Sequence, residues 1–301
     1  MDTKIGFVGL GQMGKWMALN VLKQGFDLTV FDLDQQAVTA LTAEGAKTAA
    51  SPSALAAETD WIFLSLPNTD IVEAVIFGAD GLVHHARPGQ LVIDLGTTGY
   101  MATLEFAKRL EAKGVDFSDS PVSGMEARAQ AGTLTIMFGG RKKIFNQVQP
   151  IFNSLGNLIL YVGNLGSGQL TKLINQLLFN ISAAAIAEIL PMAVKLGLDP
   201  EKVLNVVNTG TGQSFASEFF GQRILKNHFT DGYALKHAYK DMISAAEICA
   251  HKKIPLPLVH AATTTYQLAL AAGLGDEDKG AMIKVFENIL GVEFRKKEER
   301  K

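Results

Sequence analysis

Residues 4–14 decide the fold and read Lys4-Ile5-Gly6-Phe7-Val8-Gly9-Leu10-Gly11-Gln12-Met13-Gly14. The run Lys4–Val8 has the composition of a strand, and Met13–Gln24 has the pattern of a helix. Glycines in such a strand–turn–helix unit allow a tight turn and let the backbone approach a pyrophosphate, which the positive end of the helix dipole stabilises. We therefore expect this turn to bind a dinucleotide through five of its residues, namely Gly9, Gly11, Gln12, Met13 and Gly14.

The position of Asp32 strengthens this interpretation, because a GxGxxG pattern by itself is weak. Asp32 directly follows a second strand candidate, Leu28–Phe31, and no arginine accompanies it before Asp34. A carboxylate there accepts hydrogen bonds from both ribose hydroxyls and repels a 2′-phosphate, which predicts NAD(H) in preference to NADP(H). The alternative is that Asp32 caps the next helix, although Asp34 is the better capping candidate.

Short β-branched runs alternate with helix-length segments up to Gly163. This alternation predicts βαβ units and a mainly parallel sheet covered on both faces, that is, a doubly wound Rossmann domain over residues 1–163. The strand candidates are Ile5–Val8, Leu28–Phe31, Trp61–Leu66, Leu91–Asp94, Val115–Ser118, Leu134–Phe138 and Leu158–Val162.

Helical periodicity takes over after Gly163 and predicts an all-α domain over residues 164–301. The first of its helices, Ser167–Leu196, is long enough to join the two domains. The helix candidates are Ser167–Leu196, Pro200–Asn208, Ser214–Lys226, Tyr233–Lys252, Leu258–Ala272 and Lys279–Leu290.

Composition narrows the class of protein. The 301 residues carry a formal net charge of -2, which gives no broad attraction for nucleic acid or for an anionic membrane. Cys249 is the only cysteine, so no intrachain disulfide forms, and the N-terminal residues do not resemble a signal peptide. Charged and amide residues interrupt the apolar stretch Leu170–Leu198, which favours a buried helix over a spanning one. We expect a cytoplasmic protein.

Two loops should complete the cofactor site. Leu66-Pro67-Asn68 and Gly96-Thr97-Thr98 lie at the ends of the third and fourth strand candidates, on the same edge of the sheet. Open parallel sheets bind ligands at the carboxyl ends of their strands, so we expect Leu66, Pro67, Asn68 and Thr97 to contact the nicotinamide half of the cofactor. As local structure alone, both loops are ordinary turns.

Lys172 is the candidate for the reacting group. It lies in an otherwise apolar helix with Asn175 and Gln176, at i+3 and i+4 on the same face. Lysine is rarely buried without a partner, so this group indicates either a site or an interdomain polar network. The cofactor motif favours a site.

Two further segments are candidates for substrate binding. The loop at Ser123-Gly124 can direct backbone N–H groups and a hydroxyl at a carboxylate, or can be a plain turn. Lys240-Asp241 lies on a predicted helix, where a solvated surface charge is the alternative. Arg128 is interpreted as a surface residue. The histidines have no metal-ligand spacing, so no metal is predicted.

Four of these motifs, in this order, resemble the β-hydroxyacid dehydrogenase family, which includes 3-hydroxyisobutyrate dehydrogenase and tartronate semialdehyde reductase. The motifs are Gly9–Gly14 with Met17–Asn20, Asp119–Gly140, Gly168–Gln176 and Lys240-Asp241. The resemblance spans nearly the whole chain. It implies an oxidoreductase that interconverts a small β- or γ-hydroxy acid and its semialdehyde, and a homodimer or homotetramer.

The resemblance also assigns roles. It implies that Lys172 is the catalytic general acid and base, that Ser123 and Gly124 bind the substrate carboxylate, and that Asn175 and Gln176 help to hold the substrate. Lys240 would line both the cofactor and substrate sites, and Asp32, Leu66 and Thr97 would contact NAD.

Some residues depart from the family pattern or divide it. Met125 replaces the second glycine that often follows Ser-Gly, and Gln176 stands where many members have asparagine, as in the tartronate semialdehyde reductase branch. Glu126–Ala129 resembles that branch, whereas Gly212–Phe215 is closer to hydroxymethylglutarate and 4-hydroxybutyrate dehydrogenases. Two other functions stay open: a non-catalytic NAD-binding scaffold protein and an imine reductase on the same fold.

Overall fold

The computed structural model describes residues 3–296 and divides into two compact units. The division falls between Lys172 and Leu173, within a long helix. The boundary expected after Gly163 coincides with the end of a strand.

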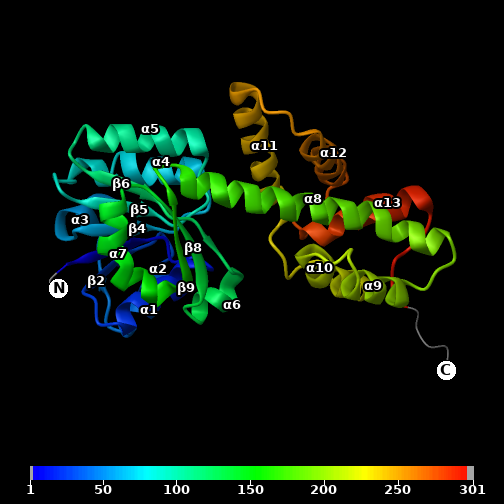
Figure 1. The fold of residues 1–301 in the computed structure, drawn as a ribbon. Coiled ribbons are helices and arrows are strands. Elements are labelled where there is room, and N and C mark those ends of the chain that lie inside the picture. The colour runs from blue at the N-terminus through cyan, green and yellow to red at the C-terminus, as the bar shows by residue number, and fades with distance from the viewer. Residues whose placement is uncertain (1–2, 297–301) are drawn as a thin grey trace. The chain divides into compact units, whose positions relative to one another are not determined.

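The first unit contains one twisted sheet with the strand order of a doubly wound fold (Figure 1). Its parallel part runs β3-β2-β1-β4-β5-β6, so the strand order reverses between β1 and β4. The bounds are β1 Ile5–Val8, β2 Leu28–Phe31, β3 Lys47–Thr48, β4 Trp61–Leu64, β5 Leu91–Asp94 and β6 Asp116–Asp119. The predicted Rossmann architecture is confirmed.

The other edge of the sheet is mixed. β8 (Leu134–Gly139) pairs with β6 and with the short β7 (Val122–Ser123) in the antiparallel sense, and β9 (Gly156–Gly163) runs parallel to β8. The two-residue strands β3 and β7 were not expected, because two residues leave no alternation to recognise.

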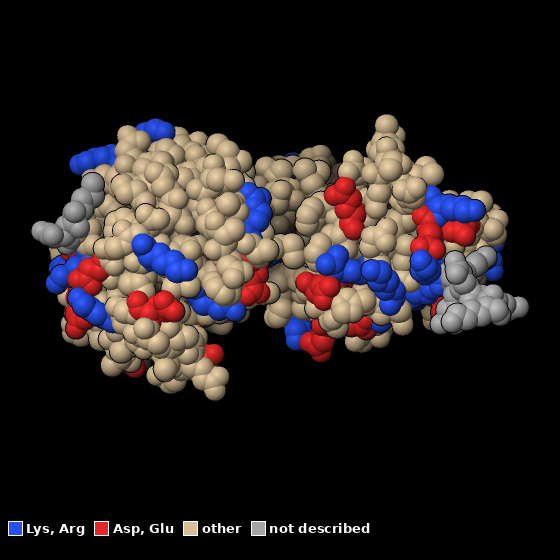
Figure 2. Space-filling view, turned by 90° about the horizontal axis from the view of Figure 1, so that it is seen from below, with Lys and Arg blue, Asp and Glu red and all other residues tan. Residues whose placement is uncertain are grey.

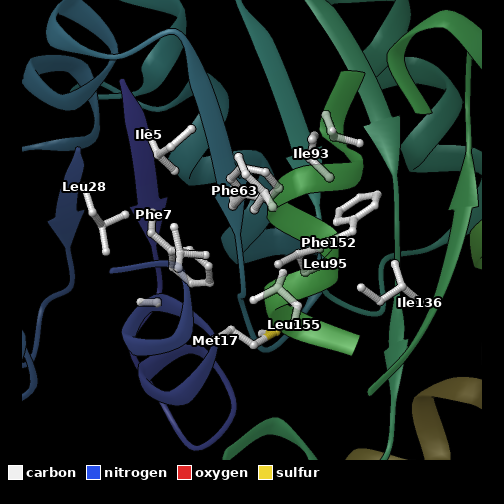
Figure 3. Close-up of a cluster of buried hydrophobic side chains, with 14 of the residues drawn as sticks. Ile5, Phe7, Met17, Leu28, Phe63, Ile93, Leu95, Ile136, Phe152 and Leu155 are labelled. Carbon is white, nitrogen blue, oxygen red and sulfur yellow. The ribbon is translucent and has the colours of Figure 1, made fainter. Parts of the chain in front are cut away.

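Alternating side chains of the central strands bury apolar surface on both faces of the sheet. Ile5 and Phe7 join a cluster that includes Met17 and Phe152, drawn in Figure 3. Val8 lies in a separate cluster on the other face. This two-residue period is what a parallel sheet covered on both sides requires. The first face is covered by α1 (Gly14–Lys23), α2 (Gln35–Ala43) and α7 (Lys142–Leu155), and the second by α3 (Pro52–Glu58), α4 (Thr69–Phe77) and α5 (Tyr100–Glu111).

The parallel strands end at one level, which positions the candidate site. Val8 is in register with Phe31 on one side and Leu64 on the other, and the register continues through Asp94 to Asp119. The loops that follow these residues therefore leave the sheet side by side, at the edge where open parallel sheets bind ligands.

The second unit is helical, as expected. Its core is built around buried side chains of α8, among them Ala183, Ala187 and Leu190. Within the described residues, its strand-like pairing is limited to an isolated bridge between Ala234 and Asp278. The helices are α8 (Ser167–Lys195), α9 (Pro200–Thr209), α10 (Phe215–Leu225), α11 (Leu235–Lys252), α12 (Pro257–Ala271), the short 3₁₀ turn η2 (Lys279–Met282) and α13 (Ile283–Leu290).

α8 is long and apolar enough to cross a membrane by length and composition alone, and 44% of its most apolar window is buried within the protein. Core helices of soluble proteins meet the same criterion, so this is weak support for a membrane span. Basic and acidic side chains are interspersed on the face shown in Figure 2, in keeping with the small net charge.

Candidate active site

The three glycines after β1 serve two different purposes. Gly9 has φ +96, and a Cβ there would collide with the carbonyl oxygen of Ser65; a Cβ on Gly14 would collide with the carbonyl oxygen of Gly9. A Cβ on Gly11 would meet nothing within 4 Å. The fold itself therefore requires Gly9 and Gly14, whereas Gly11 leaves open space beside the turn. Within residues 3–296, no side chain caps the N-terminus of α1, which leaves the N–H groups of its first turn for a phosphate.

Asp32 supports the glycine turn from the end of β2. Its Oδ2 accepts the Leu10 N–H at 2.5 Å, and its Oδ1 accepts the Asp34 N–H at 2.8 Å. A carboxylate offers about four lone-pair positions, so capacity remains for ribose hydroxyls. Asp34 caps α2 by accepting the Gln36 N–H at 2.9 Å, as the sequence indicated.

The loops after β4 and β5 lie together. The Thr69 hydroxyl accepts the Gly99 N–H at 3.0 Å and so joins them. Asn68 uses its side chain to cap α4, accepting the Ile71 N–H at 2.9 Å. Pro67 is exposed and Thr97 is half-buried. Both loops follow strands that end in register with β1, so they lie at the strand-end edge that also carries the glycine turn.

The Ser123-Gly124-Met125 segment has an unusual backbone. Gly124 has φ +147 and Met125 has φ 61, both in the region that favours glycine. A left-handed conformation costs a residue with a Cβ roughly 1–2 kcal/mol. A glycine at position 125 would adopt this conformation without that cost. Arg128 is exposed and donates to the Thr133 carbonyl at 2.8 Å, in agreement with a surface role.

Glu126 ties this segment to α1, which the sequence did not indicate. It lies in α6 (Met125–Gln130), accepts the Trp16 indole N–H at 2.8 Å and pairs with Lys15 at 3.0 Å. Hydrogen bonds from Trp16, then Lys15, then Gln12 lower the pKa of Glu126 to about 2. The Ser123-Gly124 loop, which is the candidate for binding the substrate carboxylate, is thus attached to the helix that follows the glycine turn.

Two buried carboxylates at the strand ends hold the backbone nearby. Asp94 accepts the Gly96 N–H at 2.8 Å and the Thr98 hydroxyl at 2.5 Å. Asp119 accepts the N–H groups of Gly166 and Gln169, each at 2.7 Å, and so fixes the start of α8. Burial raises the pKa of Asp119 to about 6, although those hydrogen bonds act in the opposite direction.

Lys172 is the last residue of the first unit and is buried, with 8% of its surface exposed. It follows the Asp119-anchored turn of α8 by one helical turn. The first unit therefore carries the glycine turn, Asp32, Thr97, Ser123 and Lys172.

The other expected substrate residues belong to the second unit. The Asn175 amide donates to Gln176 Oε1 at 3.3 Å, and Gln176 donates to the buried Asp241 at 3.4 Å. Lys240 is half-buried on α11. Asp241 thus orients Gln176, a contact that the sequence did not assign. Among residues 3–296, no group of three or more His, Cys, Asp or Glu side chains could hold a metal ion.

These observations fit a dinucleotide. The turn provides an uncapped helix end and open space at Gly11, and Asp32 has free acceptor capacity beside it. When bound, a nicotinamide dinucleotide supplies or accepts a hydride.

Comparison with known proteins agrees with this geometry. A family model described as the NAD binding domain of 6-phosphogluconate dehydrogenase matches residues 4–163, and one described as NAD-binding of NADP-dependent 3-hydroxyisobutyrate dehydrogenase matches residues 166–286. The chain is similar to 2-(hydroxymethyl)glutarate dehydrogenase of Eubacterium barkeri, with 40% identity over 97% of each protein.

Other relatives are similar over comparable lengths. 2-Hydroxy-3-oxopropionate reductase of Escherichia coli is 32% identical over 94% of this chain and 97% of the relative. The crystal structure of 3-hydroxyisobutyrate dehydrogenase from Salmonella typhimurium superposes with a TM-score of 0.85 at 31% identity, covering 94% of this chain and 100% of that one.

Proposed function

The chain belongs to the family of 3-hydroxyisobutyrate dehydrogenases and related hydroxyacid dehydrogenases, and on that premise we propose that it interconverts a small β- or γ-hydroxy acid and its semialdehyde. It is an oxidoreductase with a nicotinamide-dinucleotide domain.

The burial of Lys172 one turn beyond the Asp119 anchor carries the proposal. Held at the glycine turn and Asp32, a reduced nicotinamide dinucleotide would supply the hydride that the aldehyde carbon accepts in the reductive direction. The Lys172 ammonium stabilises the developing alkoxide and donates a proton to its oxygen, which leaves the alcohol and a neutral amine. In the oxidative direction, the amine accepts the hydroxyl proton. A positioned acid or base of this kind contributes about 10²–10⁴-fold to the rate.

The remaining roles concern binding. Ser123 and Gly124 hold the substrate carboxylate, and the glycine-specific backbone at Gly124, with φ +147, supports this by turning the chain sharply after Ser123. Asn175, Gln176 and Lys240 hold the rest of the substrate, with Gln176 oriented by Asp241.

NAD(H) is the preferred cofactor in this proposal. Asp32 supports it, because its carboxylate lies beside the glycine turn and carries the charge that disfavours a 2′-phosphate. The glycine turn holds the pyrophosphate through Gly9, Gly11, Gln12, Met13 and Gly14. The nicotinamide side is formed by Leu66, Pro67, Asn68 and Thr97.

A homodimer or homotetramer and a cytoplasmic location complete the proposal. Apolar side chains on α8 are exposed at Ile174, Leu178 and Ile189, by 62%, 64% and 56% respectively, and a second copy would cover such a surface. Light scattering that shows a monomer at micromolar concentration contradicts the oligomer.

A non-catalytic scaffold protein is the alternative from another class, and an imine reductase is the alternative enzyme. The presence of Lys172 in a chain that also carries the cofactor motifs favours the dehydrogenase over both. The test is NADH oxidation with succinate, methylmalonate and tartronate semialdehydes and glyoxylate, and NAD reduction with 2-(hydroxymethyl)glutarate. Turnover of one or more of these acids supports the proposal. NADH binding without turnover of any supports the scaffold, and reduction of cyclic imines alone supports the imine reductase.

A further inference from the structure

One buried side chain binds the backbone on both sides of Thr97. Gln169 is 3% exposed in the first turn of α8. Its Oε1 accepts the Thr98 N–H at 3.1 Å, and its Nε2 donates to the Gly96 carbonyl at 3.0 Å and to Asp94 Oδ2 at 3.5 Å. The loop after β5 is therefore attached to the start of α8 through this one amide.

The same helical turn is fixed to the sheet through its backbone. Asp119 accepts the Gln169 N–H at 2.7 Å, and Asp119 is the register partner of Asp94 on the neighbouring strand. Two adjacent strand ends thus hold Gln169, one through its main chain and one through its side chain. All of these contacts lie within the first unit.

Lys172 follows Gln169 at i+3, so the two residues lie on the same side of α8, one turn apart. Gln169 therefore sets the position of Thr97, on the nicotinamide side, relative to the proposed proton donor. We propose that Gln169 is a positioning residue for hydride and proton transfer, which acts through the Thr97 loop and Lys172 without touching the substrate. This inference rests on the proposed function.

Gln90 offers a matched control, because it binds backbone in the same way at the other end of β5. It is 2% exposed, donates to the carbonyls of Ala56 and Thr59, each at 2.6 Å, and accepts the Arg87 N–H at 2.6 Å. Loss of either glutamine side chain removes buried hydrogen bonds and destabilises the first unit. Only Gln169 lies at the strand-end edge that carries the site.

The test compares Gln169→Leu with Gln90→Leu in the full-length chain. Misplacement by about 1 Å can cost about 10²-fold in rate. We expect Gln169→Leu to lower kcat by about 10–100-fold while the Kd for NADH changes by less than about 3-fold. Gln90→Leu should leave kcat within about 2-fold, because its bonds lie away from the site. A normal kcat in Gln169→Leu, or an equal loss in Gln90→Leu, overturns the inference.

Gln169→Glu supplies a readout that a purely structural role would not change. An ionised glutamate cannot donate to the Gly96 carbonyl and is repelled by Asp94, whereas a protonated glutamic acid regains one donor. The ratio of its kcat to that of the wild type should therefore rise as pH falls from 8 to 5. A pH-independent ratio contradicts the proposed contact.

Hydrogen exchange separates this inference from the proposed function. If the wild-type protein turns over none of the tested acids, the proposed function fails, and amide exchange then decides the role of Gln169. Gln169→Leu should accelerate exchange in peptides that contain Thr98 and in the first turns of α8, and Gln90→Leu should not. Unchanged exchange at Thr98 in Gln169→Leu overturns the attachment itself.

Discussion

Replacement of Asp119 by asparagine should remove a specific pH dependence from the stability of the first unit. Asp119 is fully buried between β6 and the start of α8. Its pKa is raised from 3.8 to about 6, chiefly by burial. The folded state therefore binds the Asp119 proton more tightly than the unfolded state does, so stability falls as pH rises through this range.

The size of this effect follows from the pKa difference. With 1.36 kcal/mol per pKa unit, a rise from 3.8 to about 6 corresponds to about 3 kcal/mol. The penalty from Asp119 should be small at pH 4, should increase between pH 4 and 6, and should approach its full size near pH 7. In Asp119→Asn, one N–H of the pair Gly166 and Gln169 loses its acceptor at every pH, which adds a constant cost.

Urea unfolding at pH 4, 5, 6 and 7, monitored by tryptophan fluorescence, measures the effect. Both tryptophans, Trp16 and Trp61, lie in the first unit, so the signal reports on that unit. The free energy of unfolding of the wild type relative to Asp119→Asn should fall by about 2.4 kcal/mol from pH 4 to 7. Titration of other groups, such as Glu126, is common to both proteins and cancels. Equal pH slopes in the two proteins refute the reasoning.

Two further substitutions test the cofactor side of the site, and a third tests the backbone strain at Met125. Gly11→Ala should leave the free energy of unfolding within about 0.5 kcal/mol, because its Cβ meets nothing within 4 Å, yet should weaken NADH binding by about 10-fold or more by fluorescence titration; undiminished NADH affinity would place the pyrophosphate elsewhere. Asp32→Asn should raise the kcat/KM for NADPH relative to NADH by about 30-fold, since removing a unit charge near a doubly charged phosphate is worth about 2 kcal/mol; an unchanged ratio counts against Asp32 as the selecting charge. Met125→Gly should raise the urea unfolding free energy by about 1 kcal/mol, because it relieves the φ of 61; a marked loss of stability would show that the Met125 side chain outweighs the strain.

Local pattern was sufficient for most of the fold. Strands with apolar runs bounded by glycine or aspartate were predicted with the observed bounds at Ile5–Val8, Leu28–Phe31 and Leu91–Asp94. The long helix was predicted to within a residue of Ser167–Lys195. A strand that is buried on both faces of the sheet has apolar residues at consecutive positions. Such a strand can therefore be recognised from a short stretch of sequence.

The contacts that organise the site were beyond local pattern. Glu126 meets Trp16 across 110 residues, and Asp119 meets Gly166 across 47. The spacing of apolar residues along the sequence does not show which distant N–H group donates a hydrogen bond to a given carboxylate. Asp119 and Gln169 both belong to the motifs recognised in the sequence. A polar side chain in a motif can bind either a ligand or the backbone, and the sequence alone does not distinguish the two.

Lys172→Ala tests the central claim most directly. The measurement is single-turnover hydride transfer from NADH to a semialdehyde that the wild type reduces, together with NADH titration of the same variant. The account predicts a loss in rate of about 10²-fold or more with nearly unchanged NADH affinity. Hydride transfer at the ordinary rate without the Lys172 ammonium would contradict it.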